Sequence, residues 1–577
     1  MGLAGQHDDR STLRRRAPGR PARRGPAVAV LVALLTGLAA CGDDGDGGDD
    51  GGAAEVPPVE WVRVGYDLAN TRAVEDEVTI GPDDVSELAP AWEVTGLDGV
   101  SGTPAVVDGT VYVGDWTGHV RALDAASGEE LWAQQVSPGY IGGSVAVDGD
   151  RVVAGTFDAR LVALDRDSGE VVWETDLDEH PKAVVFGSPI VVDDLVVAGV
   201  GSFEVFVPGD PSTFRGSVVA LDAATGEERW RFWTTAGDES EGPGVSIWSS
   251  PAVDTERGVL YVGTGQGYAP PAPPRSDALV ALDLETGEEV WTAQFTAGDT
   301  WTIRDQTGAD ADVGAMPNLF TADGVDAVGV GDKAGTYRAL DRDTGELLWE
   351  RPLTEGGLQG GVMASAAVAA GTIYVASNDA SQDALLFALD ADTGEELWRA
   401  EVGAHVTGPV TWANDVLYLA DDGGGIAAYA AEDGERLWRH EVDAPAAGGV
   451  AVVEGTVYAG WGWWLAAAPD DPSGGIAAFR LPEGEGGDGG DRAAGGDGGD
   501  GPDGAAVYRG NCAACHGASG QGGVGPGFEG IGDRLSVEEQ IEVVREGRGR
   551  MPAWEDELSP EEIEAVVAYL NDELSGG

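Results

Sequence analysis

Short stretches in which apolar and polar residues alternate fill most of the chain between residues 88 and 481. Residues 111–114 and 120–123 are examples, and an alternation with a period of two predicts half-buried β-strands. A recurring phrase separates these stretches: an apolar residue, Asp, two variable residues, Ser or Thr, Gly, Glu, two further residues and Trp. The Asp and Gly predict a tight turn in which glycine adopts a positive φ, and the Trp belongs to the strand that follows.

The phrase recurs at intervals of 40 residues or more, which is the length of a four-stranded propeller blade. The seven copies occupy residues 123–132, 164–173, 221–230, 282–291, 340–349, 389–398 and, more weakly, 429–438. Two further pieces, residues 88–94 and 476–481, each resemble part of a blade, and joining them would close the ring without a free sheet edge. The sequence therefore predicts an all-β propeller of eight blades over residues 59–481, with seven blades as the rival count.

The spacing between successive copies is greatest between Leu164 and Leu340. Insertions in repeats of this kind become loops on one face, which is often the binding face. We therefore expect an active site, if there is one, in the loops of this part of the ring.

The segment Cys512-Ala513-Ala514-Cys515-His516 carries the most specific chemistry of the chain. Two thiols at this spacing can bond covalently to the vinyl groups of a haem, and the adjacent histidine can bind the iron. Residues 504–577 contain one histidine and one methionine, so His516 and Met551 are the expected axial ligands. A disulfide or half a zinc site is the alternative, although a zinc site would need further Cys or His partners.

The same region predicts a small all-α domain. A capping-box sequence at residues 536–539 predicts a helix that ends near Glu546. Ser559 and Pro560 predict the start of the last helix, because proline is favoured in the first helical turn. Residues 504–577 are therefore expected to form a cytochrome domain.

Charge and composition define the remaining segments. The chain has 34 basic and 101 acidic residues, a net charge of −67, which argues against nucleic acid as a partner. Residues 42–58 and 482–503 are rich in Gly and acidic residues, and we expect disordered linkers there.

The first 41 residues have the features of an export signal. Six arginines between Arg14 and Arg24 precede an apolar stretch, residues 27–40, that is too short to span a bilayer. Small residues lead to Cys41 as in a bacterial lipobox, so we expect acylation of Cys41 and anchoring to the outer face of the cell membrane. A plain secretory signal with an incidental cysteine is the alternative.

Four motifs resemble the quinoprotein alcohol dehydrogenases, particularly their polyvinyl alcohol dehydrogenase branch: TFRGSV (213–218), IWSSP (247–251), GTGQ (263–266) and GDTW (298–301), followed by GDKAG (331–335). The C-terminal region resembles class I cytochromes c. The resemblance implies pyrroloquinoline quinone (PQQ), Ca²⁺ and haem c as cofactors.

The resemblance also implies roles for individual residues. Trp248 matches the tryptophan on which PQQ stacks, and Asp299 matches the catalytic base. Glu204 and Gln266, with Asp299 nearby, match the calcium positions. Lys333 matches the cation beside the quinone oxygens.

Arg215 could offset a carboxylate of PQQ. Two positions depart from the family pattern: Gln266 replaces the usual Asn, and Pro211 and Ser212 stand where the branch usually has adjacent cysteines.

The implied function is an exported, lipid-anchored dehydrogenase that oxidises a small or polymeric alcohol. Electrons would pass through the haem to an external acceptor such as a cytochrome or a terminal oxidase. The alternative is a non-catalytic propeller that acts as a scaffold or binding lipoprotein and carries a haem c electron relay.

Overall fold

The computed structural model describes residues 59–482, with gaps at 208–211, 239, 358–359, 380, 382 and 463–473. In the C-terminal region it describes residues 504, 507–508, 512, 516, 528, 531–548, 551, 554 and 558–572. Cys41, Pro211 and Cys515 lie outside the described residues, as do the expected export segment and nearly all of both expected linkers.

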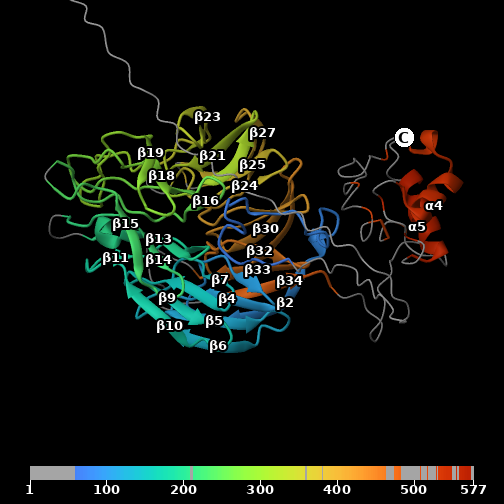
Figure 1. The fold of residues 1–577 in the computed structure, drawn as a ribbon, viewed down its shortest axis with the longest axis horizontal. Coiled ribbons are helices and arrows are strands. Elements are labelled where there is room, and N and C mark those ends of the chain that lie inside the picture. Colours follow the sequence, from blue (N-terminus) through green and yellow to red (C-terminus); the bar gives the residue numbers. More distant parts are fainter. Residues whose placement is uncertain are drawn as a thin grey trace, which may run out of the picture. The chain divides into compact units, whose positions relative to one another are not determined.

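The strands form eight sheets, each with four antiparallel strands, which Figure 1 shows following one another around a ring. The first four, from the innermost strand outward, are β3 (Ala105–Val107), β4 (Thr110–Gly114), β5 (His119–Asp124) and β6 (Glu130–Gln135); β7 (Ala146–Asp148), β8 (Arg151–Gly155), β9 (Arg160–Asp165) and β10 (Val171–Asp176); β12 (Ile190–Val192), β13 (Leu195–Ser202), β14 (Ser217–Asp222) and β15 (Glu228–Trp233), with β11 (Ala183–Val184) paired to β13; and β16 (Ala252–Asp254), β17 (Val259–Gly263), β18 (Ala278–Asp283) and β19 (Glu289–Gln294).

The next three sheets are β20 (Asn318–Ala322), β21 (Val325–Gly331), β22 (Thr336–Asp341) and β23 (Leu347–Pro352); β24 (Ala367–Ala369), β25 (Thr372–Asn378), β26 (Ala384–Asp390) and β27 (Glu396–Glu401); and β28 (Thr411–Ala413), β29 (Val416–Ala420), β30 (Gly425–Ala430) and β31 (Arg436–Glu441), with β1 (Ala73–Val74) parallel to β28. The eighth contains β32 (Ala451–Val453), β33 (Thr456–Trp461), β34 (Gly475–Arg480) and, as its outer strand, β2 (Ala89–Thr95). The prediction of eight blades, the last made from both ends of the propeller sequence, is confirmed.

Each blade is joined to the next by a tryptophan of its outer strand. The indole N–H donates to a backbone carbonyl beside the following blade at 2.9–3.1 Å in all eight cases. The pairs are Trp92 with Ala125, Trp132 with Arg166, Trp173 with Ala223, Trp230 with Leu284, Trp291 with Arg342, Trp349 with Ala391, Trp398 with Ala431 and Trp438 with Leu88. The repeated tryptophans are therefore structural.

The glycine of the repeated phrase provides the surface against which this indole packs. In seven turns it has a positive φ of 69–76°, and a methyl group on its Cα would overlap the tryptophan ring of the preceding blade. At Gly287, for example, an added Cβ would lie 2.7 Å from Cδ2 of Trp230. The repeat thus needs glycine for two reasons, the backbone conformation and the space for the ring.

The residues before the first blade form an axial segment, residues 61–74, that the sequence pattern does not predict. Its backbone bonds, in chain order, to the innermost strands of six blades at 2.8–2.9 Å. The pairs are Trp61 with Val106, Val62 with Val147, Leu68 with Val253, Ala69 with Leu319, Thr71 with Val368 and Arg72 with Trp412. Because these strands surround the axis of the ring, the segment occupies the space that they enclose.

Arg72 connects the axial segment to the last blades of the ring. Its side chain is fully buried and donates to the carbonyls of Val64, Val410 (2.9 Å) and Val450 (3.4 Å) and to the hydroxyl of Thr411 (2.8 Å). Burial lowers the pKa of Arg72 to about 9, so the guanidinium is still charged at neutral pH. These bonds satisfy a charged group in the interior without a carboxylate.

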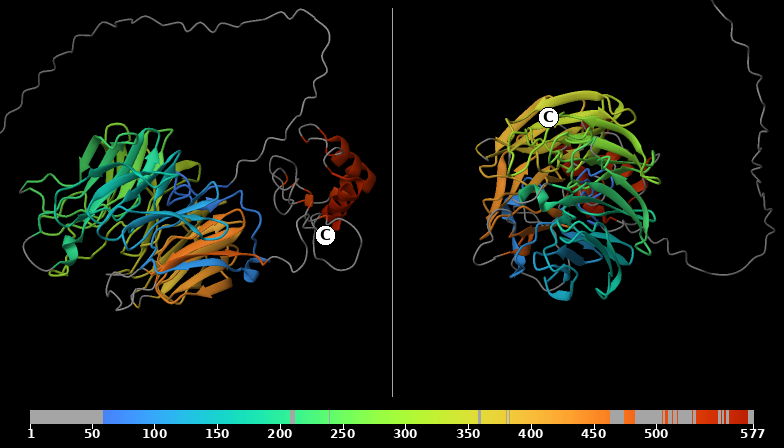
Figure 2. Two further views of the ribbon diagram at one scale, coloured as in Figure 1. Left: turned by 90° about the horizontal axis from the view of Figure 1, so that it is seen from below. Right: turned by 90° about the vertical axis from the view of Figure 1, so that its left-hand side faces the viewer.

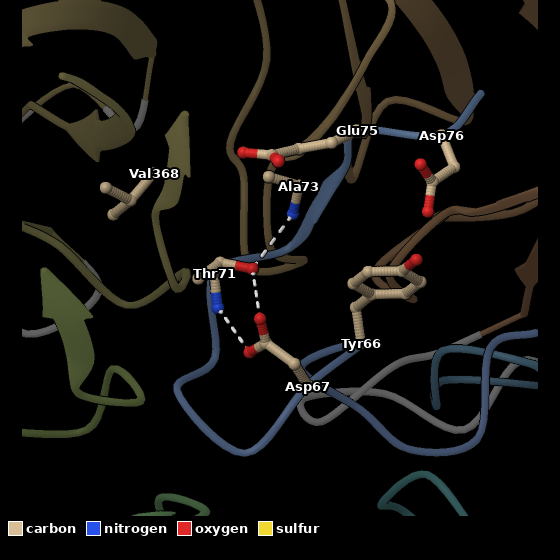
Figure 3. Close-up of a pocket in the computed structure, with 7 residues that line it drawn as sticks. All are labelled: Tyr66, Asp67, Thr71, Ala73, Glu75, Asp76 and Val368. Atoms are coloured by element: carbon tan, nitrogen blue, oxygen red, sulfur yellow. Dashed lines mark hydrogen bonds between the residues drawn. The ribbon is translucent and has the colours of Figure 1, made fainter. Parts of the chain in front are cut away.

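A pocket of about 270 Å³ lies beside the axial segment and is shown in Figure 3. Its lining residues are Tyr66, Asp67, Thr71, Ala73, Glu75, Asp76 and Val368, and the Asp67 carboxylate accepts bonds from the Thr71 N–H and hydroxyl. The chain leaves this pocket at Glu77, which accepts a bond from Gly455 in the β32–β33 turn. None of the expected site residues lines it.

The C-terminal region contains the helices α3 (Ile531–Arg534), α4 (Val537–Glu546) and α5 (Pro560–Asp572). α4 has the bounds that the capping box predicts, and α5 begins at Pro560, as Ser559 and Pro560 predict. Their apolar residues form a core with Tyr508 and Phe528. None of the helices among the described residues has the length and apolar character needed to cross a membrane.

The packing of glycine on tryptophan gives a test of what holds adjacent blades together. We expect Gly287→Ala to destabilise the protein by about 3 kcal/mol, because the methyl group meets Trp230 and also strains a left-handed backbone. Gly258→Ala is the matched control: its φ is 63° but no atom lies within 4 Å of the added methyl, so we expect a loss of only about 1 kcal/mol. Thermal unfolding followed by tryptophan fluorescence measures both. Equal losses would show that ring packing contributes nothing.

Candidate active site

The expected site residues lie in loops at one edge of the blades. In an antiparallel blade, the connection between the second and third strands leaves the sheet at the same edge as the connection to the next blade. Four long loops of these two kinds follow β13, β15, β17 and β19; they cover residues 203–216, 234–251, 264–277 and 295–317. They contain every expected residue of the quinone site except Lys333, which lies in the short loop between β21 and β22 at the same edge.

Backbone pairing joins the four long loops to one another. Arg215 pairs with Gly244, Gly244 with Gly267, and Gly267 with Thr300, which gives one contact between each loop and the next. The Gly216 N–H donates to Gly244 at 2.9 Å, and the Trp301 N–H donates to Gly267 at 3.0 Å. Gln266 and Asp299 therefore lie on neighbouring backbone segments, and the loops have a fixed arrangement.

Trp248 is half-buried, and glycines cover part of its indole. A Cβ at Gly314 would overlap the six-membered ring, and a Cβ at Gly265 would lie 3.5 Å from Nε1. The ring therefore rests on backbone atoms and keeps part of its surface accessible. Such a supported indole suits stacking by a planar aromatic ligand.

Lys333 is buried between two carboxylates that the sequence analysis did not identify. Its Nζ lies 2.7 Å from Asp310 Oδ2 and 3.4 Å from Asp312 Oδ2. Asp312 also accepts the backbone N–H of Gln266 at 2.6 Å, and the Gln266 amide faces the same carboxylate, to which its NH₂ group can donate. Lys333 and Gln266 are thus brought together through Asp312.

Asp299 is 3% exposed, and the loop that follows it fixes its orientation. Its two carboxylate oxygens accept the backbone N–H groups of Ala309 at 2.7 Å and Ala311 at 3.1 Å. Each oxygen keeps a second lone pair for a proton or a cation.

Asp277 is a further buried carboxylate that the sequence analysis missed. It is fully buried, and neither oxygen has a hydrogen-bond partner among the described residues. Burial, reinforced by the negative charges of Asp312 and Asp299, raises the pKa of Asp277 to about 9. Burial and Asp312 likewise raise the pKa of Asp310 to about 7, although Lys333 opposes this shift.

The sequence analysis missed these acids because only their burial distinguishes them from other acidic residues, and the sequence does not reveal burial. The one available signal was the position of Asp310 and Asp312 in the same long loop as Asp299. In a chain with 101 acidic residues, that signal does not separate buried acids from solvated ones.

Glu204 is buried in the first of the four long loops. Its Oε2 accepts the backbone N–H groups of Thr213 at 3.0 Å and Phe214 at 2.9 Å. Its Oε1 lies 3.8 Å from His180 Nε2 and 4.0 Å from Lys182 Nζ. None of the contacts among the described residues joins Glu204 to Gln266 or Asp299.

Arg215 contacts neighbours other than the residues of the expected quinone site. Its guanidinium lies 4.5 Å from the ring centre of Trp233, and its Nε donates to the Thr235 hydroxyl at 3.0 Å. None of its contacts with the described residues reaches Trp248 or Lys333.

In the C-terminal domain, one helical turn aligns two of the expected haem residues. The Cys512 N–H donates to Tyr508 at 2.8 Å, and the His516 N–H donates to Cys512 at 3.0 Å. The His516 ring is 7% exposed and stacks on Phe528 at 4.6 Å. Met551 packs against the apolar core that contains Cys512 and Phe528.

Comparison with known proteins decides the family. The model described as "Glucose/ethanol/alcohol dehydrogenase, beta-propeller domain" matches residues 61–364, more than half of the 577 residues. The chain belongs to this family. The model "Cytochrome C oxidase, cbb3-type, subunit III" matches residues 499–570, and "Outer membrane protein assembly factor BamB" matches residues 333–486.

Relatives of this chain include proteins named as polyvinylalcohol dehydrogenase and quinohemoprotein alcohol dehydrogenase, the family that its motifs resemble. A polyvinylalcohol dehydrogenase of Pseudomonas sp is 30% identical over 305 residues, which cover 48% of this chain and 41% of that protein. The quinohemoprotein alcohol dehydrogenase ADH-IIG of Pseudomonas putida is 30% identical over 375 residues, 56% of this chain and 50% of the relative. The chain thus spans about half or less of the length of these relatives.

Solved structures share the fold. The structure of ADHIIG from Pseudomonas putida HK5 has a TM-score of 0.64 at 23% identity and covers 89% of this chain and 95% of its own. A europium-containing methanol dehydrogenase has a TM-score of 0.61 at 20% identity and covers 74% and 98% of the two chains. The matches to the dehydrogenase and cytochrome family models confirm the expected cofactor classes, PQQ for the propeller and haem c for the C-terminal domain.

Gly314 gives a test of the indole platform. We expect Gly314→Ala to weaken PQQ binding about tenfold or more, because the methyl group displaces the Trp248 ring. Titration of PQQ into the metal-loaded apoprotein, followed by absorbance, measures the affinity without requiring turnover. Gly81→Ala is the control, since its methyl would meet only two polar side-chain ends, Asn414 at 3.2 Å and Asp84 at 3.9 Å. Unchanged affinity in Gly314→Ala would rule out Trp248 as the platform.

Proposed function

We propose that this protein oxidises an alcohol at the site formed by Trp248, Asp299 and Lys333 and transfers the electrons to a haem in its C-terminal domain. The observation that supports this most is the buried Lys333, held by Asp310 and Asp312 beside the supported Trp248 indole. A propeller without a ligand in this place would have no need for a buried lysine among buried acids, since such charges are costly to bury.

Bound PQQ would supply the oxidant, which accepts a hydride from the carbinol carbon of the substrate. Trp248 would provide the stacking surface for its ring system. The Lys333 ammonium, kept charged by Asp310 and Asp312, would stabilise negative charge that develops on quinone oxygens.

Asp299 would accept the proton of the alcohol hydroxyl. The two backbone N–H bonds fix its carboxylate and leave lone pairs free for this proton. Loss of the proton to Asp299 and of the hydride from carbon together convert the alcohol into a carbonyl compound.

Calcium would be held by Asp299 and Gln266, which lie on neighbouring backbone segments, because their oxygen atoms are the ligand type that Ca²⁺ takes. Glu204 is the proposed third ligand; in this structure one of its carboxylate oxygens accepts bonds from Thr213 and Phe214, and the other would face the ion. The excess of buried carboxylates around one lysine makes this region favourable for a cation. A calcium ion there would act as a Lewis acid toward the bound cofactor.

In the C-terminal domain, Cys512 and Cys515 would bond covalently to the haem, and His516 and Met551 would bind its iron. The haem would accept electrons one at a time. An external acceptor, such as a cytochrome or a terminal oxidase, would then receive them. We further propose that the protein is exported and lipid-anchored through Cys41. The basic and then apolar segment that precedes Cys41 supports this proposal.

A second candidate function is a non-catalytic scaffold or binding propeller with a haem relay. The match of residues 333–486 to the outer-membrane assembly factor model favours it. The four long loops, however, all lie before Lys333, within the stretch that matches the dehydrogenase model.

Replacement of the proposed base tests the catalytic function. We expect Asp299→Asn to lower turnover about 1,000-fold, since the amide cannot accept the alcohol proton. Haem reduction is followed at the α band after PQQ, Ca²⁺ and isopropanol are added to the full-length protein. Asp305→Asn, an exposed acid of the same loop, is the matched control and should retain wild-type turnover. Asp299→Asn activity within tenfold of wild type would rule out this role.

A further inference from the structure

Five aromatic side chains form an unbroken series of ring contacts, which we call the aromatic strip: Trp116, Tyr140, Phe157, Phe203 and Phe186. Trp116 stacks on Tyr140 with ring centres 4.6 Å apart and planes inclined by 14°. The following ring-centre distances are 4.5 Å for Tyr140–Phe157, 4.6 Å for Phe157–Phe203 and 4.8 Å for Phe203–Phe186.

The strip lies at the same edge of the blades as the candidate active site. Its residues come from five successive connections at that edge, between β4 and β5, β6 and β7, β8 and β9, β11 and β12, and after β13. These connections belong to the first three blades. The views in Figures 1 and 2 show these blades adjacent to one another in the ring.

One end of the strip adjoins the proposed quinone platform. Gly187, which follows Phe186, lies so close to the backbone of Trp248 and Ser249 that a Cβ there would be 3.3 Å and 2.6 Å from their carbonyl oxygens. Phe203 precedes Glu204 directly in the short helix η2 (Phe203–Phe206). The strip thus begins at the candidate site and leads away from it across three blades.

The rings of the strip are half-buried, whereas the aromatic rings of the blade cores, such as Tyr337 and Phe387, are buried. At the end of η2, Phe206 is 40% exposed and lies 6.4 Å from Phe203. A continuous row of apolar rings that are partly open to solvent is the kind of surface that lines ligand-binding grooves.

The surroundings of the strip are held in place, and the acids nearest to its rings are ion-paired. The Trp116 indole N–H donates to the Ser101 hydroxyl at 2.9 Å, and Gly139 leaves the space that the Phe157 ring fills. The acids next to these rings are paired: Asp115 with Arg121 at 2.6 Å and Asp158 with Arg160 at 3.0 Å. A rigid surface of rings without unpaired charge favours an aliphatic chain, and its rigidity lowers the entropy cost of binding.

We propose that the aromatic strip is an extended substrate subsite that binds the carbon chain of a polymeric alcohol, while one of its carbinol groups reacts at Asp299. The inference rests on the proposed function and specifies its substrate class. The length of the strip supports a chain rather than a small alcohol, which could contact only one ring next to Trp248. Relatives named polyvinylalcohol dehydrogenase, 30% and 32% identical to this chain, support the same class.

Kinetic selectivity tests the subsite. We expect Phe157→Ala and Tyr140→Ala in the full-length, PQQ-loaded protein to raise the KM for polyvinyl alcohol about tenfold more than the KM for isopropanol. Phe232→Ala removes a half-buried ring from the outer strand β15 and is the matched control, for which we expect neither KM to change. Equal changes for both substrates, or no change for the polymer, would overturn the subsite. Circular dichroism of each variant excludes a general loss of folding.

Direct binding separates this inference from the proposed function. Calorimetric titration of polyvinyl alcohol into the PQQ-free full-length protein should show binding that Phe157→Ala and Tyr140→Ala weaken about tenfold and Phe232→Ala leaves unchanged. If no alcohol is oxidised but this pattern is found, the proposed function fails and the subsite stands. If the wild-type protein oxidises isopropanol but does not bind the polymer, the subsite fails and the proposed dehydrogenase function stands. The subsite also fails if the strip variants change self-association of the protein instead of polymer binding.

Discussion

The contact between an outer-strand tryptophan and the turn of the next blade is the interaction on which the rest of the structure depends. It combines a hydrogen bond from the indole N–H with packing of the ring on a glycine, and it recurs around the ring. Because every blade donates the same indole hydrogen bond to the next, the ring closes only if both ends of the propeller sequence complete it. Trp92 of β2 and Trp438 of β31 do so, with bonds to Ala125 and Leu88.

The axial segment adds a second constraint, from the inside. Trp61 to Arg72 bond to one inner strand after another, so the segment fixes the relative positions of blades that do not touch each other. Arg72 extends this constraint to the last two blades, because its side chain donates to the carbonyls of Val410 and Val450. Since a guanidinium without partners would be costly in the interior, these contacts must all be present in the folded ring.

The sequence predicts the blades well because their contacts are local and repeated. Asp, Gly and Trp stand at fixed spacing, so the phrase that defines the turn also identifies the interaction between blades. The axial segment escapes such reasoning because residues 61–74 pair with strands far away in the chain and have no alternation of their own. The same limit applies to the site: motifs locate Trp248 and Lys333, but only the assembled loops show that Asp277, Asp310 and Asp312 are buried.

Buried acids around a single lysine make the backbone pairing of the loops necessary. Asp299 and Asp312 repel each other in a region of low dielectric constant, and Lys333 offsets only part of their charge, while the raised pKa of Asp277 keeps that acid protonated at neutral pH. Repulsion of this kind would drive the loops apart if side chains alone held them. The pairing of Gly244 with Gly267, and of Gly267 with Thr300, does not depend on charge or pH. The loops can therefore carry a strongly charged site because uncharged backbone bonds, fixed at the edge of a closed ring, hold them together.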